Sequence, residues 1–180
     1  AQLAAWDEEH FAAISIKGSA KALSPFAAID VKNLDAKIIP MITPEQIAAM
    51  SPAQASTLRA EQTAELSADQ AAALTITQAA TFSSKGFSAL SNVAIAALNN
   101  KFLAALPPKT FAAMTSEQLQ ALTVEQVHSV TAGQIGALKS NQIAALESED
   151  VAALSKAAIA GFNKTNMSGL TLTELSGDGQ

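Results

Sequence analysis

The fold is decided by an eight-residue unit whose clearest copies are TPEQIAAM at residues 43–50 and TVEQVHSV at residues 123–130. Each copy begins with Thr, has Gln at its fourth position and ends on a large apolar residue. A large apolar residue then recurs at every eighth position from Phe26 to Leu170 without a break. In a repeat this strict, each unit packs on its neighbours, and activity depends on the side chains that the array displays on its surface. The sequence therefore predicts architecture much better than it predicts activity.

The first and fourth positions of the unit form a helix-start signal. In this capping box, a Ser or Thr hydroxyl accepts a hydrogen bond from the third helical N–H, and the Gln or Glu side chain reaches back to the cap N–H. Pro44, Pro52 and Pro108 each fall one place after the cap position, where proline suits a helix start. The pattern predicts a new helix in every octad. It is complete in the octads that begin at Thr43, Ser51, Ser67, Thr75, Thr115, Thr123, Thr131 and Thr171.

The eight-residue period excludes one long helix. Eight residues at about 100° each overshoot two turns by about 80°, so the apolar stripe would circle the helix instead of staying on one face. A β-solenoid is compatible with an even period, but Ala, Gln and Glu are poor strand residues and helix caps would serve no purpose in it. We therefore predict an all-α solenoid of very short helices, one for each octad, with the β-solenoid as the alternative.

Most octads place two large side chains on one helix face, as Ile47 and Met50 show, but the fifth position is small at Ala55, Thr63, Ala71 and Ala79. Burying them contributes about 3–6 kcal/mol, against about 8–16 kcal/mol of backbone entropy, so the helices must be stabilised by stacking. We expect a capping segment at residues 1–22, the array at residues 23–175 and a polar tail or linker at residues 176–180. The abrupt start and the Gly-rich end suggest a piece of a longer protein.

Composition limits the classes of function. The net charge of -5 argues against a nucleic-acid partner, and no apolar run is long enough for membrane insertion. The chain has no cysteine, and its two histidines, His10 and His128, are far apart in sequence. Neither a phosphate-binding glycine loop nor a catalytic or metal-binding motif is present, although the acidic group at residues 147–150 could bind calcium in principle. We predict no enzyme activity, no cofactor, no bound metal and no small-molecule substrate.

The octads from residue 83 to residue 114 depart from the pattern. They lack Gln at the fourth position, they gather phenylalanines, and they carry lysine where other octads have an acidic residue. Lysine in the first turn opposes the helix dipole, so another requirement could have selected it. A solvated surface explains these lysines, and an anionic partner, a glycan or a self-assembly contact would explain them too. The candidate partner-binding residues are Lys85, Lys101, Lys109, Phe87 and Phe102.

The repeat at residues 43–50, and its copy TAGQIGAL at residues 131–138, resembles the "LTxxQIxAL" octapeptide repeats of very large bacterial secreted and surface exoproteins. The resemblance extends over residues 42–175, and it implies a secreted or surface-displayed, noncatalytic region. We therefore expect a structural spacer or protein-interaction scaffold with an extracellular or cell-surface location. Its partner would be another protein or a second copy. The alternatives are a self-assembling filament subunit and an ice- or glycan-binding surface.

The capping box gives a first testable prediction. Replacing the cap in Thr123→Ala should lower the free energy of unfolding by about 1 kcal/mol, because the N–H groups at the start of this helix lose a hydroxyl acceptor. Chemical denaturation followed by circular dichroism measures this change. An unchanged unfolding midpoint would contradict a capping role for Thr123.

Overall fold

The structure is a computed structural model, and it describes residues 30–170. Over this range the chain consists of short helices joined by tight turns and contains no strand. The all-α prediction is confirmed, and the β-solenoid alternative is not what the described residues form. The capping segment expected at residues 1–22 and the tail expected at residues 176–180 lie outside the described residues.

Each octad between residues 35 and 170 contributes one short helix. In chain order these helices are η3 (Ala36–Met41), α3 (Pro44–Ala49), α4 (Pro52–Ser56), α5 (Ala60–Ala64), α6 (Ala68–Ala72), α7 (Ile76–Ala79), α8 (Ser84–Ser88), α9 (Asn92–Ala97), α10 (Asn100–Ala105), α11 (Pro108–Phe111), α12 (Ser116–Gln120), α13 (Val124–Ser129), α14 (Ala132–Ala137), α15 (Ser140–Ile143), α16 (Ser148–Ala153), α17 (Lys156–Ile159) and η4 (Met167–Gly169), with η2 (Val31–Asn33) before them.

The backbone leaves the helical conformation at the end of each octad. After α13, Val130 has φ −62° and ψ 142°, and the next cap, Thr131, has φ −96° and ψ 159°. Two consecutive extended residues turn the chain, and α14 then starts in a new direction. The prolines lie at the starts of α3, α4 and α11, as predicted. The octad is therefore one helix plus one corner.

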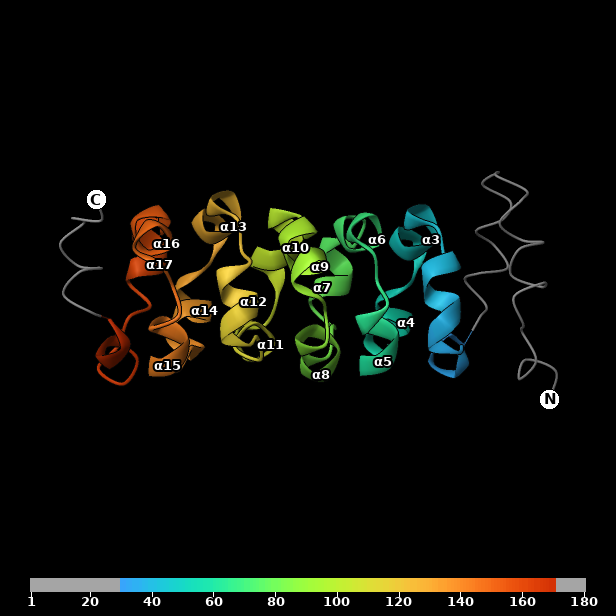
Figure 1. Cartoon of the computed structure of the whole chain (residues 1–180), viewed down its shortest axis with the longest axis horizontal. Helices are drawn as coiled ribbons and strands as arrows, with labels where there is room; N and C mark the ends of the chain where they lie inside the picture. Colours follow the sequence, from blue (N-terminus) through green and yellow to red (C-terminus); the bar gives the residue numbers. More distant parts are fainter. Residues whose placement is uncertain (1–29, 171–180) are drawn as a thin grey trace.

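The helices form three stacks, because each one packs against the helices three places before and after it in the chain. Each stack runs along the long axis of the molecule, from the blue end of the described array to the red end (Figure 1). Neighbours within a stack are therefore three octads apart in the sequence. Stack 1 contains α3, α6, α9, α12, α15 and η4; stack 2 contains η2, α4, α7, α10, α13 and α16; stack 3 contains η3, α5, α8, α11, α14 and α17.

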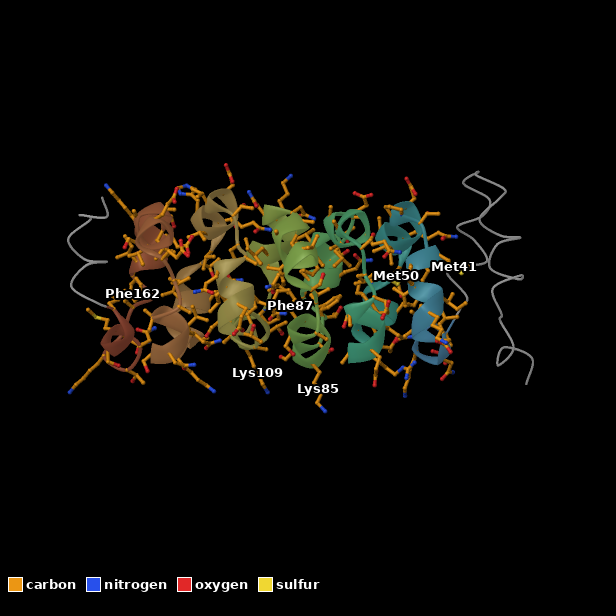
Figure 2. The ribbon with its side chains drawn as sticks, in the orientation of Figure 1. Met41, Met50, Lys85, Phe87, Lys109 and Phe162 are labelled. Carbon is orange, nitrogen blue, oxygen red and sulfur yellow. The ribbon has the colours of Figure 1, made fainter. Side chains whose placement is uncertain are left out.

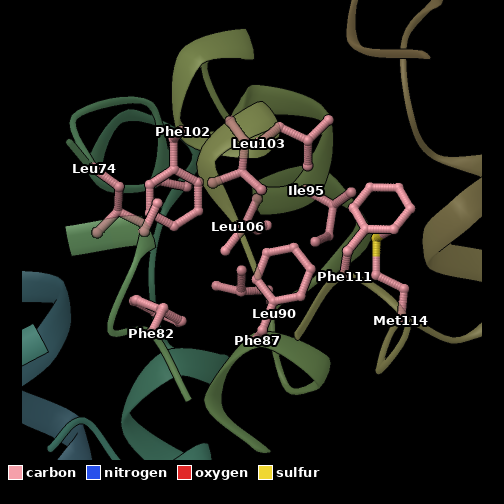
Figure 3. Close-up of a cluster of buried hydrophobic side chains, with 14 of the residues drawn as sticks. Leu74, Phe82, Phe87, Leu90, Ile95, Phe102, Leu103, Leu106, Phe111 and Met114 are labelled. Atoms are coloured by element: carbon pink, nitrogen blue, oxygen red, sulfur yellow. The ribbon is translucent and has the colours of Figure 1, made fainter. Parts of the chain in front are cut away.

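The core is a continuous seam between the three stacks. Every eighth residue from Leu34 to Leu154 is buried, which confirms the interior role predicted for this row. The row three places earlier in each octad is also buried from Val31 to Ile143. Figure 3 shows part of the seam, where side chains from α8, α9, α10 and α11 point toward one another. The array therefore buries its apolar surface along its whole length and has no single central core.

Candidate functional site

The fourth-position glutamine makes the most extensive polar contacts in the array, as Gln126 illustrates. Its Oε1 accepts a hydrogen bond from the Thr123 N–H at 2.8 Å, as the capping box predicts. Its Nε2 donates to the carbonyl oxygens of Ile95 and Leu98, both at 2.8 Å. The side chain is 1% exposed. One amide group therefore caps its own helix and also binds the preceding turn of the superhelix.

The same arrangement recurs along the chain, and we call it the glutamine ladder. In each case Nε2 donates to two carbonyl oxygens of the preceding turn, and these carbonyls belong to the last residues of one octad. They lie at the carboxyl ends of the short helices, and the fifth-position oxygens also accept the eighth-position N–H of their own octad, as Ile95 does from Leu98. The ladder consists of Gln62, Gln70, Gln78, Gln118, Gln126, Gln134 and Gln142.

The capping boxes form largely as predicted. Both bonds are present in the octads that begin at Thr43, Ser51, Ser67, Thr115, Thr123 and Thr131. In these octads the hydroxyl acts as a backbone acceptor. At Thr75 only the glutamine half forms, because the Thr75 hydroxyl lies 3.0 Å from the Thr77 hydroxyl. Thr171 lies outside the described residues.

Glutamine keeps its capping bond even where the cap residue has no hydroxyl. Gln62 Oε1 accepts from the Arg59 N–H, and Gln142 Oε1 accepts from the Lys139 N–H, at 2.9 and 3.0 Å. Both glutamines also keep their bonds to the preceding turn. The glutamine is therefore the more constant half of the motif, and its role between turns was missed from the sequence.

In two of the four octads between residues 83 and 114, another polar side chain binds the carbonyl oxygen that a ladder glutamine would reach. Asn99, at a cap position, donates from Nδ2 to the Leu74 oxygen at 2.6 Å. In the ladder this carbonyl would be the acceptor of a glutamine at the position that Phe102 occupies. Thr110 Oγ1 donates to the Phe82 oxygen at 3.3 Å. The amide contact is therefore preserved at Asn99 by a different residue, and Phe102 is free to enter the core.

The phenylalanines predicted as partner contacts lie in the interior. Phe87 and Phe102 are both 0% exposed. Their rings meet Phe82 edge to face, with ring centroids 6.4 Å and 5.7 Å away. Figure 3 shows the three side chains within the central cluster. As they stand in this structure, Phe87 and Phe102 contribute to the core and do not present their rings to a partner.

The three candidate lysines are exposed, but the fold divides them. Lys85 on α8 and Lys109 on α11 belong to neighbouring helices of stack 3, and both side chains point outward from the same edge of the molecule (Figure 2). Lys101 lies on α10, in stack 2. The octads of Lys85 and Lys109 contain no Asp or Glu. The structure therefore brings together two of the three lysines predicted to face a partner.

Asp150 occupies the glutamine position of α16, and it is buried. One carboxylate oxygen accepts from the Glu147 N–H at 3.1 Å, so Asp150 retains the capping half of the motif. Burial raises the pKa of Asp150; the Glu147 N–H bond opposes this rise, and the charges of Glu147 and Glu149 add to it. An ionised carboxylate has no N–H to offer the preceding turn. Asp150 is therefore an incomplete member of the ladder.

His128 lines a shallow pocket of about 390 Å³ between α10, α13 and α16, together with Asn100, Val124, Glu125 and Ala153. Its Nδ1 lies 3.1 Å from the Ala153 oxygen, which ties α13 to the next helix of stack 2. Between residues 30 and 170, no three His, Asp or Glu side chains come close enough together to hold a metal ion. The described helices are also all too short or too polar to cross a membrane.

Comparison with known proteins supports the repeat architecture. Residues 111–148, which include α12 to α15, match the ALTTAQ repeat family. No curated protein and no solved structure matches the chain. The protein is thus an all-α repeat protein, and its match to a known repeat family lies within the stretch where the glutamine ladder is regular.

The ladder predicts that the array loses stability when a buried glutamine amide is replaced by a carboxylate. Gln126→Glu keeps the shape of the side chain and its capping oxygen, but it places a second oxygen against the Ile95 and Leu98 carbonyls. We expect the free energy of unfolding to fall by about 3 kcal/mol at neutral pH, because buried acceptors then face one another. Part of this loss should be recovered as the pH falls from 7 to 4, because burial raises the pKa of the introduced carboxyl group and its protonated form can donate.

Gln120→Glu is the matched control for Gln126→Glu. Gln120 is exposed on α12, so this substitution introduces the same charge at a position outside the ladder. Denaturant titration at pH 7 and at pH 4 compares the two variants. Equal losses in both would show that charge alone is responsible, and would contradict the bonding assigned to the glutamine amide.

Asp150→Gln should have the opposite effect on stability. We expect it to raise the free energy of unfolding by about 1 kcal/mol, because the amide can donate to the preceding turn. The folded-state pKa of Asp150 is raised above the ordinary value of 3.8, so the stability it contributes is complete in acid and is lost as the pH rises through the folded pKa. The gain from Asp150→Gln should therefore be small near pH 3 and larger at pH 7. Thermal unfolding at both pH values measures it.

Glu149→Gln is the control for Asp150→Gln, since it removes the same charge from an exposed position of the same helix. If Glu149→Gln stabilises the protein as much as Asp150→Gln does, charge relief explains the gain and the ladder does not.

Proposed function

We propose that the protein is a noncatalytic structural spacer or protein-interaction scaffold of a bacterial secreted or surface protein. The observation that supports this proposal is that some positions of the octad face the interior and others face the solvent. The fourth, fifth and eighth positions face the interior through most of the array and bind one turn to the next. The third position is exposed in every octad between residues 35 and 170 and varies in residue type, whereas the sixth position is mostly exposed and mostly alanine. Such a molecule holds its outer side chains at fixed positions along a rod.

The exposed positions supply the chemistry with which a scaffold would bind its partner. Lys85 and Lys109 offer two cations on adjacent helices of stack 3, and stack 1 offers Glu45, Asp69 and Glu117 at the equivalent position of its helices. The pKa of Glu45 and of Glu117 is lowered, chiefly by the N–H of the same residue and then by the cap hydroxyl, so both carboxylates are anionic at neutral pH. We assign the Lys85 and Lys109 edge to contact with an acidic protein surface.

The likeness of the repeat to those of bacterial exoproteins supports a location outside the cell. Protease treatment or antibody labelling of intact cells would test it. Labelling only after cell lysis would contradict a surface or secreted location.

The spacer proposal is tested by lengthening the array. A second copy of residues 115–138, inserted after Leu138, adds three octads and keeps every later octad in its own stack. We expect the maximum dimension in small-angle scattering to increase, with the helical content per residue unchanged. The control is a Gly/Ser insertion of equal length at the same point, which should act as a flexible hinge. An inserted array that scatters like the flexible control would overturn the spacer role.

A further inference from the structure

The pocket beside His128 is lined by residues that the octapeptide fold does not require. Val124 holds the second octad position, where most other octads have Pro, Ala, Ser or Asn, and it is 44% exposed. His128 holds the sixth position, where most other octads have alanine. The two residues are four places apart on α13, so they share one face of the helix. Two departures from the repeat therefore meet at one exposed place, and display of this kind is where repeat proteins carry their binding chemistry.

The pocket also offers hydrogen-bond acceptors. The Ala153 carbonyl oxygen, 3.1 Å from His128 Nδ1, can only accept, so in the neutral imidazole Nδ1 carries the hydrogen and Nε2 is an acceptor. Glu125 adds a carboxylate from the same helix, and Asn100 adds a side-chain amide oxygen from α10. Within residues 30–170, no hydrogen bond or ion pair occupies Nε2, the Glu125 carboxylate or the Asn100 amide. These three groups therefore remain available to a donor from outside the array.

The rest of the lining is apolar. Val124 on α13 and Ala153 on α16 present methyl groups beside the three acceptors. The pocket has a volume of about 390 Å³ and is shallow, so it suits one extended side chain better than a large cofactor. A matching ligand combines an apolar stem with several hydrogen-bond donors at its tip.

Charge and donor number decide between the possible occupants. An anionic group would face the Glu125 carboxylate, and an apolar group would remove water from that carboxylate without replacing its hydrogen bonds. The ammonium group of a lysine is a compact point charge, whereas a guanidinium spreads five N–H donors over a plane and can reach acceptors on two helices at once. Arg59 is the only arginine among residues 1–180, and its Nη2 donates to the Leu34 oxygen at 3.1 Å. The occupant is therefore an arginine of a partner.

We propose that the pocket formed by Asn100, Val124, Glu125, His128 and Ala153 binds an arginine side chain of a partner protein. The guanidinium donates to the Glu125 carboxylate and to His128 Nε2, and its methylene stem packs on Val124. This inference rests on the proposed scaffold function and adds a second contact to it. Stack 2 receives a basic group at this pocket, whereas the lysine edge of stack 3 meets an acidic surface.

The test is a titration of the full chain with N-acetylarginine methylamide, followed by NMR, which detects binding in the millimolar range. N-acetylcitrulline methylamide is the matched control, because it has nearly the same shape without the charge. Both titrations use one mildly alkaline pH, at which histidine is ordinarily neutral. We expect saturable shifts of the backbone signals of residues 124–128 and of Ala153, and about fivefold weaker binding of the citrulline compound, because the charge-assisted hydrogen bonds are lost.

Variants of the chain locate the contact. Glu125→Gln should weaken binding of the arginine compound about fivefold, because the carboxylate partner of the guanidinium is removed. Glu117→Gln is the matched control, since it removes the same charge from the third octad position of α12, in stack 1, and binding should be unchanged. His128→Ala introduces the residue most common at the sixth position, so the helical content should be retained while binding is weakened.

Absence of saturable shifts at residues 124–128, equal binding of the two compounds, or full binding to the Glu125→Gln variant would overturn the pocket proposal. None of these results would affect the spacer proposal, because lengthening the array after Leu138 is measured without any ligand. Conversely, a flexible inserted array would count against the spacer while leaving the arginine result intact.

Discussion

The structure depends on one primary amide placed between two turns of a superhelix. A helix this short leaves most of its backbone groups without helical partners, and the octad satisfies those at both ends with the same kind of glutamine. The oxygen of Gln126 serves the start of its own helix, and the nitrogen serves the end of a helix one turn earlier. Very short helices become stable because other octads supply part of the bonding that each one lacks. Hydrogen bonds from the glutamine amides and apolar packing therefore hold the same turns of the superhelix together.

The central octads show how far this constraint can be relaxed. Where Phe102 replaces the amide, Asn99 reaches the vacated carbonyl from the cap position, and the ring joins Phe82 in the core. The core therefore gains an aromatic ring at this octad, while the amide that binds the preceding turn lies at the cap position. At Asp150 no such exchange occurs, and a buried carboxylate is left with its capping bond alone. The substitutions at Phe102 and Asp150 thus have different consequences, because only the octad of Phe102 supplies a replacement donor, Asn99.

Much of this architecture could be predicted from the sequence, because two independent patterns share one register. The caps fix where each helix begins, and the row from Leu34 to Leu154 fixes which side is interior. The three stacks could not be predicted, since the corner angle depends on packing between helices three octads apart. The bonding of glutamine to the preceding turn had one signal: a capping box accepts Glu as readily as Gln, yet no described octad has Glu at its fourth position. Phe87 and Phe102 were predicted as possible partner contacts because they gather in the octads that lack glutamine, although Phe87 holds the fifth position, which the repeat places in the interior.

The threefold arrangement of stacks has a genetic consequence. Gain or loss of a single octad by replication slippage would leave the interior intact, because the inward positions are nearly the same in every unit. All units downstream would, however, move to the adjacent stack, and a change between α8 and α11 would separate Lys109 from the edge it shares with Lys85. Only tandem duplications in multiples of three would conserve the pattern of faces. An array of this kind can evolve new combinations of surface chemistry by changing its copy number, without a single point mutation.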